Sequence, residues 1–353
     1  MSAALPSTSR EVRLVRTPTG LPLASDLEVV ARPLPRPAAG EVLVRNRHFQ
    51  VFAGLRTLLG GETDGLPLPT VRPGDTLFGP TLGEVVDAPE GSGLRPGDRV
   101  EHLLGWREYA SLPVAQVTPA TDRLPDPVAR LSSGASAYAG LVRLARLREG
   151  DTVFVTGAAG GVGTLAGQLA RLLGAGRVLG STGSAAKAER LTALGYEAVY
   201  VRGRQPVDRW LREAAPEGID VLLDTVGGEQ LTAAVRAARP GARFALVGAL
   251  AGQLAPERHG GSAPTEIDSF RVITRGISIQ GLNGADHPGL GEEWLTRFAD
   301  WLRADEITFP HHRIPGIERA PRALEDMLGG GHFGTVIVDV DADGARELGA
   351  SQR

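Results

Sequence analysis

Hydrophobic and polar positions follow one pattern in the first third of the chain and another in its middle. Between residues 11 and 117, short apolar runs alternate with turns rich in proline and glycine, such as Arg72-Pro73-Gly74-Asp75. Such runs predict short strands, for example at 12–15, 41–45 and 83–86. Many short strands joined by frequent turns indicate a barrel-like β domain, and its loops are the natural place for substrate specificity.

From about residue 131, strand and helix patterns alternate. Helices are indicated where apolar residues recur every three or four positions, and strands where short β-branched runs end at glycine or polar residues. Repeated βαβ units predict a parallel sheet that is doubly wound. The predicted strands are 153–155, 177–180, 198–201, 220–224, 243–247 and 277–281, and the predicted helices are 131–147, 185–194, 206–215, 229–238 and 291–303, with one more beginning near Val162.

The tail of the chain returns to extended runs. It contains one short helical piece at 320–328 and a final strand at 332–338. Its strands look like the missing edge of the first domain, and the domain of alternating strands and helices would then be an insertion. We therefore expect a first domain at 1–129 that is completed by 309–353, and a second domain at 130–308.

A stretch almost without side chains joins the strand at 153–155 to the helix that follows. It reads Gly157-Ala158-Ala159-Gly160-Gly161-Val162-Gly163. Such a turn lets backbone N–H groups at a helix N-terminus approach a pyrophosphate, and the helix dipole favours negative charge there. A tight turn can also require glycine without any ligand, since glycine adopts positive φ freely. We interpret the stretch as the phosphate loop of a dinucleotide site.

The end of the second strand indicates which dinucleotide is bound. It reads Ser181-Thr182-Gly183-Ser184, about where an NAD-binding fold places an Asp or Glu for the ribose 2′-hydroxyl. No acid is present there, and Lys187, the only lysine of the chain, follows instead. A lysine ammonium close to serine and threonine hydroxyls predicts a binding site for the 2′-phosphate of the cofactor. The predicted cofactor is therefore NADP(H) in preference to NAD(H). The alternative is a surface lysine in an arginine-biased composition.

Composition excludes several classes of protein. The chain has 353 residues, of which 42% are hydrophobic and 22% charged, with a net charge of −3; these values are typical of an ordinary soluble protein of two domains. Without a basic excess we expect no nucleic-acid partner. No apolar run approaches the roughly 18 residues of a membrane span, and the N-terminus is not a signal peptide, so we expect a cytoplasmic protein without a membrane partner.

Cysteine is absent. This excludes disulfides, a thiolate nucleophile and a Cys-ligated zinc site, and with it the zinc alcohol dehydrogenases. Seven histidines include the adjacent pair His311 and His312 in an extended segment, but no His-Glu-x-x-His pattern occurs. We therefore expect no bound metal.

Several motifs occur in a fixed order. They are Pro18-Thr19-Gly20, Ser25-Asp26-Leu27-Glu28, Gly105-Trp106-Arg107-Glu108-Tyr109, Gly134-Ala135-Ser136-Ala137-Tyr138, Ala158-Ala159-Gly160-Gly161-Val162-Gly163, Gly183-Ser184-Ala185-Ala186-Lys187, Asp224-Thr225-Val226-Gly227-Gly228, Val247-Gly248-Ala249 and Gly334-Thr335. Their order resembles the medium-chain dehydrogenase/reductase superfamily over nearly the full chain, and within it the zinc-independent prostaglandin reductases and alkenal double-bond reductases. The resemblance implies an α/β protein with a GroES-like β-barrel catalytic domain, a Rossmann nucleotide-binding domain and a homodimer.

The resemblance also implies cofactor contacts by position. The glycine loop would bind the pyrophosphate, Lys187 the 2′-phosphate, and Ser136 would lie near the nicotinamide carboxamide. Arg202 replaces a tyrosine that faces the adenosine phosphate, and its charged fork suits that phosphate. The full set is Ser136, Ala159, Gly160, Gly161, Val162, Gly163, Ser181, Thr182, Lys187, Arg202, Thr225, Gly248, Ala249, Leu282, Asn283 and His332.

On the nicotinamide side the chain departs from the family. Gly248-Ala249, Leu282-Asn283 and His332 would flank the nicotinamide, and both His332 and Thr225 stand where the family usually has asparagine. Two tyrosines of the family's substrate pocket are also missing. The family motif Asp-Pro-Tyr-Met-Arg aligns with Phe52-Ala53-Gly54-Leu55-Arg56, and the second tyrosine aligns with Ala285. The resemblance to the family therefore indicates neither the substrate of this protein nor the stereochemistry of its reduction.

The expected reaction is reduction of a carbon–carbon double bond conjugated to a carbonyl, in an apolar small molecule, with hydride transfer from NADPH to the β-carbon. Charge develops on the carbonyl oxygen, and the α-carbon needs a proton. We consider solvent first as its source, then Asp286 or His287, His48 and Tyr138. A quinone reductase with the same cofactor site and an NADPH-binding protein with a structural or regulatory role are the alternatives.

Overall fold

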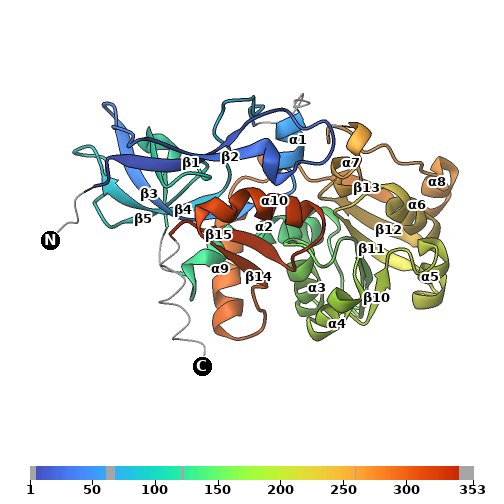
Figure 1. The fold of residues 1–353 in the computed structure, drawn as a ribbon. Coiled ribbons are helices and arrows are strands. Elements are labelled where there is room, and N and C mark those ends of the chain that lie inside the picture. The colour runs from blue at the N-terminus through green and yellow to red at the C-terminus, as the bar shows by residue number, and fades with distance from the viewer. Residues whose placement is uncertain (1–4, 61–67, 121–122, 259, 342–353) are drawn as a thin grey trace.

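A computed structural model of the chain describes residues 5–60, 68–120, 123–258 and 260–341. Two parts of the molecule lie side by side (Figure 1). One, which we call the antiparallel part, is built on a sheet whose pairs are antiparallel except for the parallel pair of β14 and β15, and the other is built on a parallel sheet. The outermost residues of the expected first domain, 1–4 and 342–353, lie outside the described residues. No helix of the described residues is both long enough and apolar enough to cross a membrane.

The parallel sheet has six strands in the order β10-β9-β8-β11-β12-β13, the strand order of dinucleotide-binding folds. The prediction of a doubly wound parallel sheet is therefore confirmed. Its strands are β8 (Thr152–Val155), β9 (Arg177–Thr182), β10 (Ala198–Val201), β11 (Ile219–Asp224), β12 (Ala238–Leu246) and β13 (Ser278–Gly281).

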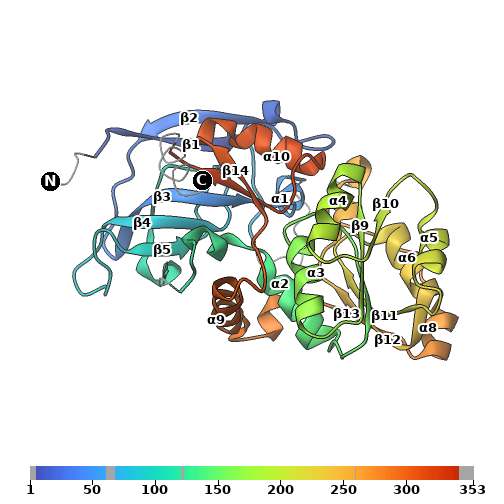
Figure 2. The ribbon, with the colours of Figure 1, turned by 90° about the horizontal axis from the view of Figure 1, so that it is seen from below.

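Helices cover both faces of this sheet (Figure 2). Alternate residues of β8 show why its run is apolar throughout: Val153 and Val155 pack into one core cluster and Phe154 into another. A strand that is buried on both faces cannot alternate with polar residues. One face is covered by α3 (Gly163–Leu172), α4 (Ala185–Ala193) and α9 (Leu290–Arg303), and the other by α5 (Val207–Ala214), α6 (Gly228–Ala237) and α8 (Ser269–Arg275).

The antiparallel part is built on a seven-stranded sheet in the order β14-β15-β3-β4-β5-β7, with β6 paired to β3. Two strands from the C-terminal region thus join strands from the N-terminal third, as the apolar runs of the tail predict. Phe49 and Val338 on one face share a core with α10, β1 and β2. The elements are β1 (Thr8–Leu14), β2 (Leu27–Pro33), β3 (Glu41–Val51), α1 (Leu55–Gly60), β4 (Thr81–Asp87), β5 (Arg99–His102), β6 (Tyr109–Pro113), β7 (Thr118–Pro119), β14 (His311–Pro315), α10 (Ala320–Leu328) and β15 (Thr335–Asp339).

Two expected elements differ from the structure. The single helix expected over 131–147 is divided into a 3-10 turn ending at Leu131, α2 (Gly134–Tyr138) and a π-helical turn, Ala139–Leu144. The first break falls at Ser132, whose backbone is extended with φ −70° and ψ 147°, so the chain leaves the helical conformation before α2 begins.

The final strand begins at Thr335 rather than at residue 332. Gly334 has a φ of +81°, and a Cβ there would lie 2.1 Å from the carbonyl oxygen of Pro310. The chain therefore makes a tight glycine turn before it can enter the sheet. Three helices, α1, α7 (Leu250–Gln253) and α8, escaped the sequence patterns because they are short.

Candidate cofactor and active site

Five loops meet at one edge of the parallel sheet. They follow β8, β9, β11, β12 and β13, and because these strands are parallel and adjacent, their carboxyl ends share this edge. We call this edge the rim. It brings together the glycine loop, Ser181 to Ser184, Thr225, Gly248-Ala249 and Leu282-Asn283.

A buried network fixes the rim between β8 and β11. The Thr156 hydroxyl donates to Asp224 Oδ1 at 2.5 Å, and the same carboxylate accepts from the backbone N–H groups of Val226 and Gly227, each at 3.0 Å. Asp224 is 1% exposed, so these donors satisfy a carboxylate that has little access to water. The Thr225 hydroxyl donates to the carbonyl of Thr156 at 2.8 Å. Thr225, expected as a cofactor contact, thus also holds the start of the glycine loop.

The neighbouring strand β9 holds the loop from the other side. Ser181 Oγ accepts from the N–H of Gly157 at 3.0 Å, and the Ser181 carbonyl accepts from the N–H of Ala158 at 2.8 Å. Gly157 has a φ of +60°, and a Cβ there would lie 2.4 Å from Thr225 Oγ1. Only glycine fits this turn. Ser181 and Thr225 therefore position the loop from its two flanks.

Gly163 and Gly160 of the loop differ in what surrounds them. A Cβ on Gly163 would lie 2.4 Å from Ala158 Cα, so this glycine permits close packing of α3 on the turn. A Cβ on Gly160 would meet nothing closer than the Gly157 carbonyl oxygen at 3.4 Å. The backbone at Gly160 is therefore open on one side at the N-terminus of α3, as the binding of a diphosphate requires.

A segment of the antiparallel part reaches this loop. We call residues 329–335 the clasp; they connect α10 to β15. The N–H of Gly334 donates to the carbonyl of Ala159 at 2.9 Å, and Gly334 forms a parallel bridge with Gly160. The guanidinium of Arg190 on α4 lies 3.8 Å from the centre of the Phe333 ring, within the range of a cation–π contact. The clasp thus joins the two parts of the molecule beside the glycine loop.

Lys187 also contacts the clasp. Its ammonium donates to the carbonyl of His332 at 2.5 Å and to that of Gly330. Burial, with a smaller effect of the Arg190 charge, lowers the pKa of Lys187. An ammonium has three donors, so one remains for another acceptor. Arg202 lies nearby, since its Nη2 would be 3.3 Å from a Cβ on Gly183.

His332 lies beside this lysine. Its ring stacks on that of His312 with centroids 4.5 Å apart. Burial, followed by the effect of His312, lowers the pKa of His332. The structure therefore brings His332 next to the predicted 2′-phosphate site, and its expected contact with the nicotinamide remains a prediction.

The loops expected around the nicotinamide lie side by side on the rim. The N–H of Gly248 donates to the carbonyl of Asp224 at 3.1 Å, and that of Leu282 donates to the carbonyl of Leu246 at 2.8 Å. Asn283 is exposed, and Ser136 is half-buried on α2. The contacts predicted for Gly248-Ala249 and Leu282-Asn283 with the nicotinamide stay predictions.

The four candidate proton donors are not brought together. Asp286 is exposed and His287 half-buried, and both belong to the rim loop after β13. His48 lies on β3, where its Nδ1 is 2.9 Å from Asp339 Oδ1. Arg313 Nε also donates to this carboxylate, at 2.8 Å.

Tyr138 is the fourth candidate. Its side chain is 2% exposed, and its hydroxyl donates to Glu293 Oε1 of α9 at 2.6 Å. Burial and this hydrogen bond raise the pKa of Tyr138. The hydroxyl therefore joins α2 to α9, whereas Asp286 and His287 stand on the rim itself.

Two further hydroxyls, which the sequence patterns do not reveal, lie against the glycine loop. A Cβ on Gly161 would be 2.8 Å from Thr335 Oγ1 and 3.3 Å from Ser133 Oγ. Ser133 Oγ accepts from Gln50 Nε2 on β3 at 2.9 Å. No local signal could indicate these neighbours, since they come from segments far apart in the sequence.

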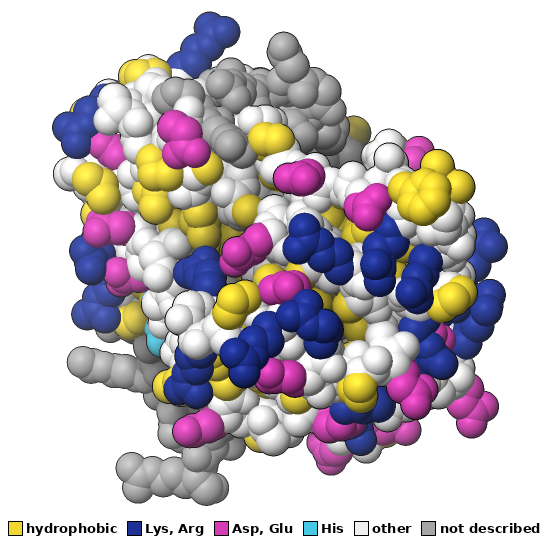
Figure 3. All heavy atoms as spheres, turned by 90° about the vertical axis from the view of Figure 1, so that its right-hand side faces the viewer, with side chains coloured by type: hydrophobic (Ala, Val, Ile, Leu, Met, Phe, Trp, Pro, Cys, Tyr) yellow, Lys and Arg dark blue, Asp and Glu magenta, His cyan; other side chains and the backbone are white. Residues whose placement is uncertain are grey.

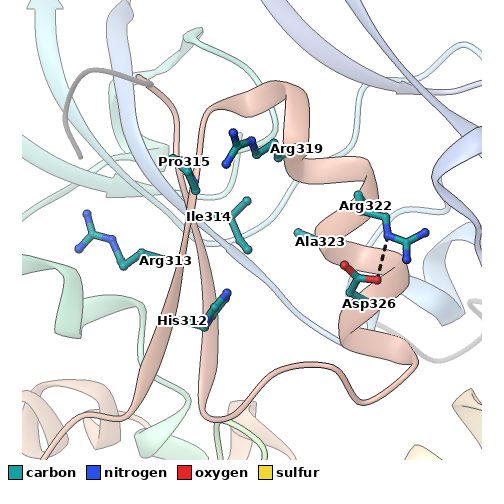
Figure 4. Close-up of a pocket in the computed structure, with 8 residues that line it drawn as sticks. All are labelled: His312, Arg313, Ile314, Pro315, Arg319, Arg322, Ala323 and Asp326. Carbon is teal, nitrogen blue, oxygen red and sulfur yellow. Dashed lines mark ion pairs between the residues drawn. The ribbon is translucent and has the colours of Figure 1, made fainter. Parts of the chain in front are cut away.

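A cavity of about 250 Å³ lies between β14 and α10. Figure 4 shows Ile314 and Ala323 on facing walls and the Arg322 ion pair with Asp326, whose Nε and Oδ1 are 2.9 Å apart. Rim residues do not line it. In the described part of the chain, no group of three or more His, Asp or Glu side chains is placed to hold a metal ion.

The strand order, the bare loop and the rim together define a dinucleotide-binding protein of two parts. Two family models match the chain: zinc-binding dehydrogenase over residues 161–302 and N-terminal domain of oxidoreductase over residues 10–120. The chain belongs to the medium-chain dehydrogenase/reductase superfamily, in the branch whose members are named NADP-dependent reductases.

Individual relatives match almost end to end. The Bacillus subtilis protein YfmJ, named as an NADP-dependent oxidoreductase, is 29% identical over 340 residues, which cover 95% of this chain and 98% of the relative. The NADPH-dependent curcumin reductase of Escherichia coli is 27% identical over 336 residues, covering 94% and 96%. The crystal structure of CurA from Vibrio vulnificus in complex with NADPH superposes with a TM-score of 0.84 at 26% identity, covering 94% and 99%.

Proposed function

We propose that this protein is an NADP-dependent medium-chain reductase that reduces the carbon–carbon double bond of an apolar α,β-unsaturated carbonyl compound. The observation that carries the proposal is the rim itself. An open glycine backbone lies at a helix N-terminus, and Lys187 and Arg202 lie beside the end of β9. The named relatives and the NADPH complex of CurA support the cofactor and the reaction class.

The residues present fit NADPH. Gly160 to Gly163 would hold the diphosphate, because the loop backbone is open at Gly160. Lys187 and Arg202 would hold the 2′-phosphate, and the end of β9 carries no acid that would repel it. Since the chain has no cysteine to ligate zinc, we further propose that the reaction needs no zinc.

When bound, NADPH supplies the hydride that reaches the β-carbon of the substrate. The chain contributes binding and orientation, which can account for most of the rate enhancement of such a transfer. Solvent delivers the proton to the α-carbon, with Asp286 and His287 as the side chains best placed to assist, because they stand on the rim loop after β13. His48 and Tyr138 are engaged by Asp339 and Glu293 instead.

An assay of NADPH consumption tests the function. We expect turnover with cyclic enones and small enals, followed as loss of NADPH absorbance. Turnover with quinones only would identify a quinone reductase, which uses the same cofactor site. Tight NADPH binding without turnover of any of these compounds would contradict the reductase assignment and favour a structural or regulatory role.

We further propose that the protein forms a homodimer through the β13 edge of the parallel sheet. β13 is an edge strand, and the preceding helix α8 exposes Phe270 (74%) and Ile273 (75%). An unpaired edge beside exposed apolar side chains suits pairing with a second copy across a two-fold axis. Figure 3 shows the face of the parallel-sheet part: acidic and basic side chains are mixed there, and an apolar cluster lies near its edge.

Light scattering after size-exclusion chromatography tests this interface. We expect the mass of a dimer for the unchanged protein and that of a monomer for Phe270→Glu combined with Ile273→Glu. Leu172→Glu, at a partly exposed position on α3, is the matched control and should remain dimeric. A monomeric unchanged protein would contradict the proposal.

A further inference from the structure

Thr335 has a buried hydroxyl that makes no hydrogen bond with the described residues. It is the first residue of β15 and is 2% exposed, and its Oγ1 has no hydrogen-bond partner among the described residues. A buried hydroxyl without a partner costs free energy, because it has given up water without a replacement. Such a group in a folded protein calls for an explanation.

The backbone forces this hydroxyl against the glycine loop. The N–H of Gly334 donates to Ala159 at 2.9 Å, and the N–H of Thr335 donates to the carbonyl of Pro310 at 3.1 Å. With the backbone held by these two bonds, the side chain lies against the loop, where Oγ1 would be 2.8 Å from a Cβ on Gly161. The position follows from the tight glycine turn and from the register of β15.

A second hydroxyl lies on the same glycine. Ser133 Oγ would be 3.3 Å from the Cβ on Gly161, and it accepts a hydrogen bond from Gln50. Because Gln50 occupies its oxygen as an acceptor, the Ser133 hydrogen is available to another group. Two hydroxyl donors therefore lie against Gly161, the residue after Gly160, whose backbone is open. An anion with several oxygens is the ligand that such donors suit.

We infer that Thr335 is a cofactor-binding residue whose hydroxyl donates to an oxygen of the dinucleotide diphosphate at the glycine loop. The inference rests on the proposed function and adds a ligand from the antiparallel part to a site built on the parallel sheet. It assigns the diphosphate rather than the 2′-phosphate, because Thr335 adjoins Gly161 while Lys187 contacts the other end of the clasp. Bound cofactor thus links the two parts of the molecule.

Thr335→Val tests the inference, because valine keeps the shape of threonine and removes the hydroxyl. Without cofactor, the melting temperature should be unchanged or higher, since the variant no longer buries an unpaired hydroxyl. The dissociation constants of NADPH and NADH should both rise about tenfold, because both carry the diphosphate. Adenosine 2′-monophosphate, which lacks a diphosphate, should bind unchanged. Thr335→Ser is the matched control and should keep affinity for both dinucleotides.

Isothermal titration of the full chain, with thermal unfolding of the apo protein, gives these readouts. If the unsubstituted protein binds NADPH and Thr335→Val binds it equally tightly, the inference is overturned but the proposed function is not. A lower melting temperature of the apo variant would also overturn it, since the hydroxyl would then have a partner within the protein. Absence of NADPH binding by the unchanged protein would overturn the proposed function and the inference together.

Discussion

Buried polar groups at the rim of the parallel sheet differ from three such groups in the antiparallel part. At the rim of the parallel sheet, Asp224 is 1% exposed and accepts three hydrogen bonds from the loops that it positions. In the antiparallel part, the Nε2 of His102, the Nε1 of Trp106 and the Oγ1 of Thr335 are buried without partners in the described structure. The rim is thus organised before a ligand arrives.

His102, Trp106 and Thr335, in contrast, each have a buried polar atom without a hydrogen-bond partner among the described residues. For His102 and Trp106 this atom reduces stability, because nothing compensates the buried donor. For Thr335 it lies next to the glycine loop, where a ligand can compensate it. The buried carboxylate of Asp224 therefore maintains the fold, whereas the hydroxyl of Thr335 is placed to bind a ligand.

The largest effect should follow from breaking the network of the rim. Asp224→Ala should lower the free energy of unfolding by about 4 kcal/mol, because three buried donors lose their acceptor and each loss costs roughly 1–3 kcal/mol. Urea denaturation measures this change, and NADPH affinity should fall with it. Glu217→Ala, whose side chain is 86% exposed and only weakly paired, should change stability by less than about 0.5 kcal/mol. Equal stability of the two variants would contradict an organising role of Asp224.

The second effect concerns pH and His102. Burial, followed by the charge of Arg107, lowers the pKa of His102 from 6.5 to about 4. Its Nδ1 accepts from the N–H of Leu104 at 3.0 Å, so the neutral ring carries its hydrogen on Nε2. Below pH 6.5 the unfolded chain takes up a proton here that the folded chain does not. His102 should therefore remove about 3 kcal/mol of stability as the pH falls from about 6.5 to about 4.

Urea denaturation at several pH values measures this slope. His102→Gln should flatten it over the same interval, because glutamine does not titrate but can still accept from the N–H of Leu104. Other groups add their own pH dependence in both proteins, so the difference between them is the quantity to compare. The same slope in the variant and in the unchanged protein would show that His102 is not the group responsible.

The third effect sharpens the assignment of the cofactor. Lys187→Met should weaken NADPH by about 10-fold to 150-fold, the range of a hydrogen bond to a charged group. The affinity for NADH should fall less, because NADH has no 2′-phosphate for Lys187 to contact. Only the part of its affinity that depends on the contacts between Lys187 and the clasp should be lost. Titration with both cofactors gives the ratio. Arg177→Met, at the opposite end of β9, should leave the ratio unchanged, and equal losses for both cofactors in Lys187→Met would remove the 2′-phosphate assignment.

Much of the architecture could be predicted from local patterns. The strand at 198–201 and the helix at 320–328 have the predicted bounds, because short apolar runs and helical periodicity are local properties. The expected helix over 131–147 was wrong as a single element, because apolar periodicity continues across the extended backbone at Ser132 and does not report the break. The strand expected from residue 332 begins three residues later, because the turn at Gly334 depends on Pro310 in another segment.

The site divides in the same way. The amino-acid sequence by itself determined the bare glycine loop, the lysine without a competing acid at the end of the second strand, and the alternation that produces a parallel sheet. Only the tertiary structure decided that Lys187 contacts the clasp, that Tyr138 pairs with Glu293, and that Thr335 faces Gly161. The physical reason is range: turns, helices and strands are encoded by neighbours along the chain, whereas these contacts depend on how distant segments pack.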